Sequence, residues 1–380
     1  MTWDIFCTVI DNFGDIGVTW RLARQLADEH RVSVRLWVDD LAAFHQIRPE
    51  VDPTRAIQTL AGVEIRHWTD PLPAFSPGEV VIEALACNLP ESFIQAMAVQ
   101  SPPPVWLNLE YLTAETWADG VHGLPSPHPR LPLVKYFYVP GFSPQTGGLT
   151  RENWLSPTRN PFQASQADQD DFWRNQKLPP RQDKELRISL FSYENAALPG
   201  WLETLAASPI PVRLLAPEGK ALPQIARALA VPELGPGTSA RQGALKVHVL
   251  PMLDQDTYDR LLWACDLNFV RGEDSFLRAQ YAARPMVWQA YRQAEGAHFA
   301  KLEAFLDRYC ATLDPDTADT TRTLWQAWNA EADMTAAWPR YLAHQPALQA
   351  HAKAWDRQLA AVPDIASKLM IFCEKIMKTR

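Results

Sequence analysis

Strand-like and helix-like segments alternate along most of this chain, and this alternation restricts its possible folds more than any other feature. In the first half, short apolar runs rich in β-branched residues recur between helical patterns. The expected strands are 3–10, 32–38, 63–68, 80–85, 105–109 and 134–139, and the expected helices are 18–29 and 91–99. Such alternation predicts an α/β fold with a parallel sheet covered by helices.

The pattern breaks between 147 and 184, where Gly, Pro, Asn and charged residues accumulate around one short polar helix expected at 166–176, and then resumes. In the second half we expect strands at 186–191, 212–216, 247–250, 267–270 and 286–289, with helices between them. The last part reads as helical, most clearly at 299–306, 321–332 and 365–378. A chain of 380 residues exceeds the size at which one core usually stops growing. We therefore expect an N-terminal domain over 1–150, a linker over 151–184, a C-terminal domain over 185–355, and a C-terminal helix within 356–380 that can pack back on the N-terminal domain.

Composition excludes several classes of protein. The net charge of -8 disfavours nucleic-acid binding, which needs a basic surface, and suits a basic partner better. The five cysteines are far apart in the sequence and mostly lie among apolar neighbours, which indicates reduced core thiols rather than a disulfide framework or a zinc site. The N-terminus lacks the positive charge of a signal peptide, and no apolar run is long enough to cross a bilayer. We expect a cytoplasmic protein that binds no membrane.

An acidic turn follows the first expected strand, a position that normally meets ligand in a doubly wound domain. Its sequence is Asp11-Asn12-Phe13-Gly14-Asp15-Ile16-Gly17. The two aspartates could converge on one acceptor group, with one of them acting as a general base. The alternative is that Asp15 or Asn12 only caps a helix that begins near Val18. The turn lacks the three glycines of a dinucleotide-binding fingerprint, and its acids would repel a diphosphate.

A second turn, Val270-Arg271-Gly272-Glu273-Asp274-Ser275, also leads from a strand into a helix. The backbone N–H groups of Asp274 and Ser275 would lie at the helix N-terminus and suit a phosphate, to which Arg271 adds a positive charge. Glu273 could bind sugar hydroxyls. The alternative makes Asp274 or Ser275 an N-cap and Arg271 half of a surface ion pair.

Other strand ends carry further candidates. Phe191, Ser192 and Tyr193 end the first strand of the second half, and Tyr193 could hydrogen-bond a phosphate or merely border the core. Gln255 and Tyr258 could hydrogen-bond and stack against a base. The motifs of serine hydrolases, zincins and P-loop proteins are missing from the sequence, and its histidines form no metal-like spacing.

Two long motifs resemble those of the EarP family, the elongation factor P arginine rhamnosyltransferases. They are Cys7-Thr8-Val9-Ile10-Asp11-Asn12-Phe13-Gly14-Asp15-Ile16-Gly17-Val18-Thr19-Trp20-Arg21-Leu22-Ala23-Arg24 and Phe269-Val270-Arg271-Gly272-Glu273-Asp274-Ser275-Phe276. The likeness extends to 36–40, 106–112, 141–143 and 147–149, so it covers both halves of the chain.

The resemblance implies a GT-B glycosyltransferase fold, with two Rossmann-like domains facing a cleft. It implies transfer of L-rhamnose, with inversion, from dTDP-β-L-rhamnose to an arginine of elongation factor P, without a metal or any cofactor besides the donor. In this family Asp15 matches the general base, Asp11 its partner acid and Glu273 a residue needed for activity. The family's donor contacts match Phe191, Ser192, Tyr193, Gln255, Arg271, Asp274 and Ser275. We also expect Asn12, Phe13, Gly14, Gly17 and Tyr258 to bind substrate. Two alternatives stay open: a sugar-nucleotide sensor that binds the translation factor without modifying it, and a GT-B transferase with a different acceptor.

Overall fold

The structure is a computed structural model that describes residues 1–10, 13–69, 71–72 and 75–379. The chain divides into two compact units. Unit 1 comprises Met1–Asn153 and Ala360–Arg380, and unit 2 comprises Trp154–Leu359. Each unit holds a mostly parallel sheet with helices on both faces, which confirms the α/β prediction.

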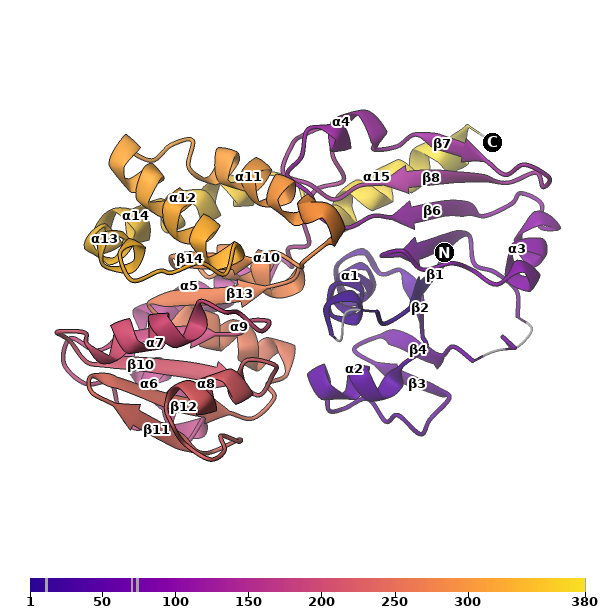
Figure 1. Ribbon diagram of the computed structural model, residues 1–380. Coiled ribbons are helices and arrows are strands. Elements are labelled where there is room, and N and C mark those ends of the chain that lie inside the picture. The colour runs from indigo at the N-terminus through magenta and orange to yellow at the C-terminus, as the bar shows by residue number, and fades with distance from the viewer. Residues whose placement is uncertain (11–12, 70, 73–74, 380) are drawn as a thin grey trace. The chain divides into compact units, whose positions relative to one another are not determined.

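The sheet of unit 1 has its first strand near the centre (Figure 1). Across the sheet the order is β3 (Ile57–Leu60), β4 (Val63–His67), β2 (Ser33–Val38), β1 (Thr2–Cys7), β5 (Val80–Ala84), β6 (Val105–Leu109), β8 (Val134–Tyr138) and β7 (Pro125–Pro127). The six inner strands run parallel, and β3 and β7 pair antiparallel at the two edges. The helices are α1 (Gly14–His30), α2 (Leu41–Ile47), α3 (Glu91–Ala98), α4 (Trp117–Val121) and α15 (Ile365–Lys378).

Alternate residues of β1 enter two different cores, as the period of a strand requires. Trp3 and Ile5 pack with apolar residues of α1 and α15, whereas Phe6 packs on the other side with Trp37 and Phe93. Because both faces are covered, the parallel strands read as nearly continuous apolar runs, and this made them recognisable in the sequence. The C-terminal helix α15 lies against α1 and β6, far from its neighbours in sequence.

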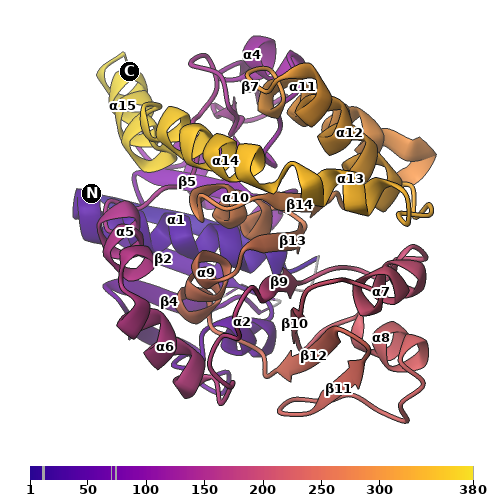
Figure 2. The same ribbon diagram turned by 90° about the vertical axis from the view of Figure 1, so that its left-hand side faces the viewer.

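Unit 2 repeats the doubly wound plan with a smaller sheet. Its order is β11 (Ser239–Gln242), β12 (Leu245–Leu250), β10 (Val212–Pro217), β9 (Leu186–Leu190), β13 (Leu267–Arg271) and β14 (Met286–Gln289), of which only β11 is antiparallel within the described residues. The helices are α5 (Leu155–Ala164), α6 (Gln166–Asn175), α7 (Leu198–Ala206), α8 (Leu222–Ala228), α9 (Gln255–Ala264), α10 (Asp274–Tyr281), α11 (Ala297–Tyr309), α12 (Pro315–Asn329), α13 (Ala337–Ala343) and α14 (Gln345–Ala360), with a 3-10 turn at η1 (Ala294–Gly296). Figure 2 shows α7 and α8 on one side of this sheet and α9 and α10 on the other.

Residues 155–175, inside the segment expected to be a linker, form α5 and α6. Leu155, Arg159 and Phe162 share the buried face of α5 at helical spacing. The buried Arg159 forms a bidentate ion pair with Asp356 of α14, at 2.6 and 2.8 Å, which ties α5 into unit 2. Helix α6 agrees with the short polar helix expected at 166–176, whereas α5 was not expected, because polar residues dominate its sequence and its narrow buried stripe did not stand out.

Candidate active site

The acidic turn of unit 1 begins just after β1, where backbone N–H groups donate to aspartate side chains and no longer to a neighbouring strand. Strand β1 was expected to reach residue 10 but ends at Cys7. Beyond it, the backbone N–H of Val9 donates to Asp39 Oδ1 at 2.9 Å, and that of Ile10 donates to Asp15 Oδ2 at 2.8 Å. The chain therefore leaves the sheet early and turns into α1.

Helix α1 starts at Gly14, four residues earlier than expected, so Gly14 and Gly17 are helical residues. Phe13 occupies the N-cap position, and its carbonyl accepts a hydrogen bond from the Gly17 N–H at 2.9 Å. Capping by Asp15 is wrong, because Asp15 lies inside the first turn of the helix. The other predicted residues of this turn, Asp11 and Asn12, lie outside the described part of the chain.

Asp15 is buried, with 1% of its surface exposed. Besides the Ile10 N–H, it accepts a hydrogen bond from the Tyr111 hydroxyl, which lies 3.1 Å from Asp15 Oδ1. The sequence reasoning did not select Tyr111, although this residue lies two positions beyond the end of β6 in a segment that resembles the family. Its position just after a parallel strand was the signal that could have identified it.

In unit 2, Arg271 ends β13 and lies in an aromatic clamp formed by Phe191 and Tyr193. Its guanidinium carbon is 4.4 Å from the centroid of each ring, and the residue is only 7% exposed. Gly272 then turns the chain with a φ of 62°, a conformation that glycine adopts without strain. The Gly272 carbonyl accepts a hydrogen bond from the Trp288 indole at 2.8 Å. Arg271 is therefore buried, not at the surface as the alternative assumed.

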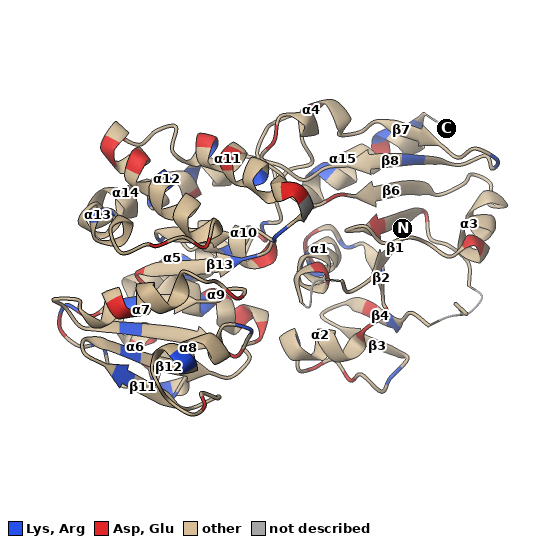
Figure 3. Ribbon diagram, viewed as in Figure 1, with Lys and Arg blue, Asp and Glu red and all other residues tan. Residues whose placement is uncertain are grey.

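Helix α10 follows at once, so a basic strand end meets an acidic helix start (Figure 3). Glu273 occupies the N-cap position, and capping by Asp274 or Ser275 is wrong because both lie in the first turn. Asp274 Oδ2 instead accepts a hydrogen bond from the Gln255 amide at 3.1 Å, which joins the starts of α9 and α10. The Ser275 hydroxyl donates to the Arg271 carbonyl and accepts from the Arg271 N–H.

The remaining predicted residues of unit 2 surround this turn. The Phe191 N–H donates to the Phe269 carbonyl at 2.9 Å, which continues the pairing of β9 with β13. Tyr258 packs against Phe191 at a ring distance of 5.6 Å. Burial raises the pKa of the Tyr258 phenol, which therefore stays neutral at physiological pH. Ser192 is buried, and its hydroxyl has no hydrogen-bond partner among the described residues.

A second residue that the sequence reasoning missed is Gln289, the register partner of Arg271 on β14. It is 6% exposed, and its side chain reaches the loop after β9. Gln289 Oε1 accepts a hydrogen bond from the Tyr193 N–H at 2.9 Å, and its amide donates to the Glu194 carbonyl at 3.3 Å. Gln289 thereby fixes the backbone that carries one ring of the aromatic clamp.

Tyr193 also borders a polar cavity of about 390 Å³. Lys220, Tyr291 and Arg292 are among its lining residues, and Tyr291 meets the Tyr193 ring at 5.6 Å. The predicted donor contact Tyr193 is thus a wall shared by the aromatic clamp and this cavity.

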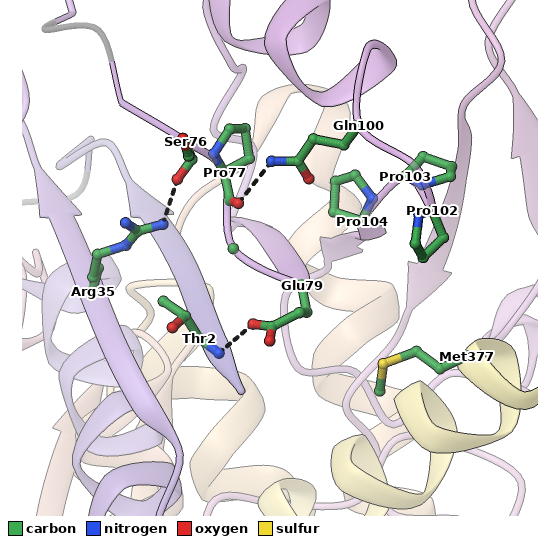
Figure 4. Close-up of a pocket in the computed structure, with 11 residues that line it drawn as sticks. Thr2, Arg35, Ser76, Pro77, Glu79, Gln100, Pro102, Pro103, Pro104 and Met377 are labelled. Carbon is green, nitrogen blue, oxygen red and sulfur yellow. Dashed lines mark hydrogen bonds between the residues drawn. The ribbon is translucent and has the colours of Figure 1, made fainter.

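A larger cavity, of about 440 Å³, lies in unit 1 beside the first residues of β1 and β5 (Figure 4). Pro102, Pro103 and Pro104 form one wall. The polar side chains are engaged with the protein itself: Glu79 accepts from the Thr2 N–H, and Gln100 donates to the Pro77 carbonyl at 2.9 Å. None of its described lining residues belongs to the predicted site.

Two further observations concern metal binding and membrane spans. Within the described ranges, no group of three or more His, Cys, Asp and Glu side chains is arranged to hold a metal ion. Among the described residues, no helix has both the length and the apolar character that a membrane span requires.

Comparison with known proteins finds relatives that match almost the whole length of the chain. The model of the family described as "Elongation-Factor P (EF-P) rhamnosyltransferase EarP" matches residues 3–374. The protein-arginine rhamnosyltransferase of Pseudomonas aeruginosa is 51% identical over 371 residues, covering 98% of each chain. That of Shewanella oneidensis is 44% identical over 386 residues, again covering 98% of each.

Solved structures agree with this result. One described as the structural basis for EarP-mediated arginine glycosylation of translation elongation factor EF-P superposes with a TM-score of 0.72 at 37% identity, over 98% of this chain and 99% of the other. A UGT transferase from Siraitia grosvenorii in complex with UDP gives a TM-score of 0.52 at 10% identity, over 99% of this chain and 100% of the other, which shows likeness of fold alone.

Two doubly wound units, with the candidate residues at the carboxyl ends of their strands, define a glycosyltransferase of the GT-B fold. The family match and the relatives then specify the family of glycosyltransferases. The chain belongs to the EarP family of elongation factor P rhamnosyltransferases, and the sequence resemblance is confirmed.

Proposed function

We propose that this enzyme transfers L-rhamnose from dTDP-β-L-rhamnose to an arginine of elongation factor P, with inversion at the anomeric carbon. The acceptor class follows from the relatives, which act on protein arginine. The observation that carries the donor half is the Arg271 guanidinium held between two rings beside the start of α10. Since a translation factor is the proposed acceptor, we place the reaction in the cytoplasm.

The acceptor needs a base because a guanidinium is a poor nucleophile. Removing its proton at neutral pH costs roughly 7 kcal/mol, since the pKa of arginine exceeds about 12. In the proposed reaction Asp15 takes this proton as the arginine nitrogen forms its bond to C1 of rhamnose. Asp15 accepts hydrogen bonds from the Ile10 N–H and from the Tyr111 hydroxyl, and these contacts orient its carboxylate. Asp11 acts as the partner acid.

The donor needs stabilisation of its leaving group. As the bond between C1 and the diphosphate oxygen breaks, the electron pair leaves with dTDP. Arg271 and the N-terminus of α10 offset this negative charge, so we propose that the reaction needs no divalent cation. Glu273 holds sugar hydroxyls, and the other donor contacts are Phe191, Ser192, Tyr193, Gln255, Tyr258, Asp274 and Ser275.

Intact-mass measurement of elongation factor P tests the proposal. After incubation with the enzyme, dTDP-β-L-rhamnose and EDTA, the factor should gain one deoxyhexose, and fragmentation should locate it on an arginine. The product's NMR spectrum should show the α anomer. Replacing the modified arginine of the acceptor by lysine should abolish the gain.

Two outcomes would contradict the proposal and favour its alternatives. An unchanged mass with dTDP still bound would indicate a sensor that binds the factor without modifying it. Transfer to another molecule, with elongation factor P unmodified, would indicate a different acceptor.

A further inference from the structure

The ends of three adjacent strands bring Asp15, Leu85 and Tyr111 together in unit 1. In the sheet register, Cys7 of β1 pairs with Ala84 of β5, which pairs with Leu109 of β6. The three residues therefore follow strands that end at the same level.

Tyr111 joins the other two through one hydroxyl. This oxygen lies 3.1 Å from Asp15 Oδ1 and 3.2 Å from the Leu85 carbonyl oxygen, so its single proton can be donated to either acceptor or shared between them. Its ring packs against the apolar core of unit 1, which fixes the position of the hydroxyl.

The backbone at Leu85 and Ala86 has a strained conformation. Leu85 and Ala86 have φ angles of 56° and 65°, a left-handed conformation that is strained for residues other than glycine. The turn is closed by a hydrogen bond from the Cys87 N–H to the Ala84 carbonyl at 3.2 Å. It is tied to β6 by the Leu85 N–H, which donates to Leu109 at 2.8 Å. Strained backbone persists where the surroundings over-determine it, and such positions cluster at functional sites.

We propose that Tyr111 is a positioning residue for the transfer reaction: its hydroxyl, placed by the packed ring and donating to Asp15 Oδ1, orients the Asp15 carboxylate toward the acceptor guanidinium. The inference rests on the proposed role of Asp15 as the base. The Ile10 N–H fixes Asp15 Oδ2, so the bond from Tyr111 to Oδ1 determines the rotation of the carboxylate plane. Tyr111 itself needs no contact with either substrate.

Steady-state kinetics of Tyr111→Phe test the proposal, because this change removes only the hydroxyl. A hydrogen bond to a charged group contributes about 1.5–3 kcal/mol, so kcat should fall about tenfold to hundredfold. The KM values for donor and acceptor should stay unchanged. Introducing 4-aminophenylalanine at position 111 should restore most of kcat, since its two N–H donors can serve both acceptors. Tyr136→Phe, at a partly buried tyrosine on β8, is the matched control and should leave kcat unchanged.

The results separate failure of this inference from failure of the proposed function. If Asp15→Asn is inactive while Tyr111→Phe retains full kcat, the hydroxyl serves Leu85 alone and the inference is wrong. A kcat loss in Tyr111→Phe that 4-aminophenylalanine does not restore would also overturn it. If Asp15→Asn keeps its activity, the assignment of the base fails instead.

Discussion

Arg271 combines burial, charge and aromatic contact in a way that only an arginine can. Its flat, delocalised guanidinium stacks on Phe191 and Tyr193, and this contact fixes the charge at the start of α10 before any ligand arrives. A cation held in advance needs no reorganisation during the reaction, which is the main advantage of such preorganised groups.

Replacing Arg271 by lysine should therefore weaken donor binding even though the charge is kept. Loss of stacking at a desolvated site costs up to about 2 kcal/mol, so the Kd for dTDP should rise about tenfold or more. Titration calorimetry measures this change. Arg227→Lys, at an exposed position on α8, is the control, and equal affinities in the two variants would contradict the clamp.

Among single residues, the sequence identified those that belong to one continuous turn. Arg271 and Ser275 could be selected together because they lie within five residues of each other. The contacts of Tyr111 and Gln289 were not visible in the sequence, because their partners, Asp15 on α1 and Tyr193 after β9, are distant along the chain, and only the place of Tyr111 just after β6 marked it as a candidate. Pairing across β1, β5 and β6, or across β9, β13 and β14, depends on a strand order that local patterns do not contain.

Among the elements, the start of α1 and the segment 155–175 differ most from expectation. The sequence indicated a strand to residue 10, but its last N–H groups are taken by Asp39 and Asp15. In α5 the polar majority concealed the buried stripe, whereas α6 has nearly the bounds that its pattern predicted. Tertiary contacts decided both cases, whereas α15 and β14 have the bounds that their own patterns predicted.

A titratable residue, His122, lies beside the contact between Tyr138 of β8 and Phe372 of α15. His122 Nδ1 accepts a hydrogen bond from the Val139 N–H at 3.1 Å, and the ring lies near Phe372 of α15. Burial, with a further contribution from Lys368, lowers the pKa of His122 to about 4 from its usual 6.5. Nδ1 can accept only while the ring is neutral.

Unit 1 should therefore lose stability as the pH falls from about 6.5 toward 4, because the unfolded chain binds this proton and the folded chain does not. Between about pH 7 and pH 5 the free energy of unfolding should drop by about 1–2 kcal/mol through His122. Urea unfolding of His122→Asn, which keeps an acceptor without the titration, should show a smaller drop. The same slope in both proteins would exclude His122 as the cause.

On the scale of the whole molecule, both α/β halves were predictable because each of their sheets is buried on two faces and so leaves a strong apolar pattern. The return of the chain to unit 1 at α15 depends on long-range packing against α1 and β6. The proposed chemistry divides in the same way: unit 1 supplies the base, and unit 2 binds the leaving diphosphate.

Titration of dTDP into the Asp15→Asn enzyme tests this division most directly, with transfer to elongation factor P measured on the same sample. Loss of a general base should reduce transfer about a hundredfold or more. The Kd for dTDP should stay within about twofold of the unmodified enzyme, because the proposed dTDP contacts belong to unit 2 and Asp15 belongs to unit 1, whereas Arg271→Ala should weaken dTDP binding strongly. Loss of dTDP binding in Asp15→Asn would contradict the account.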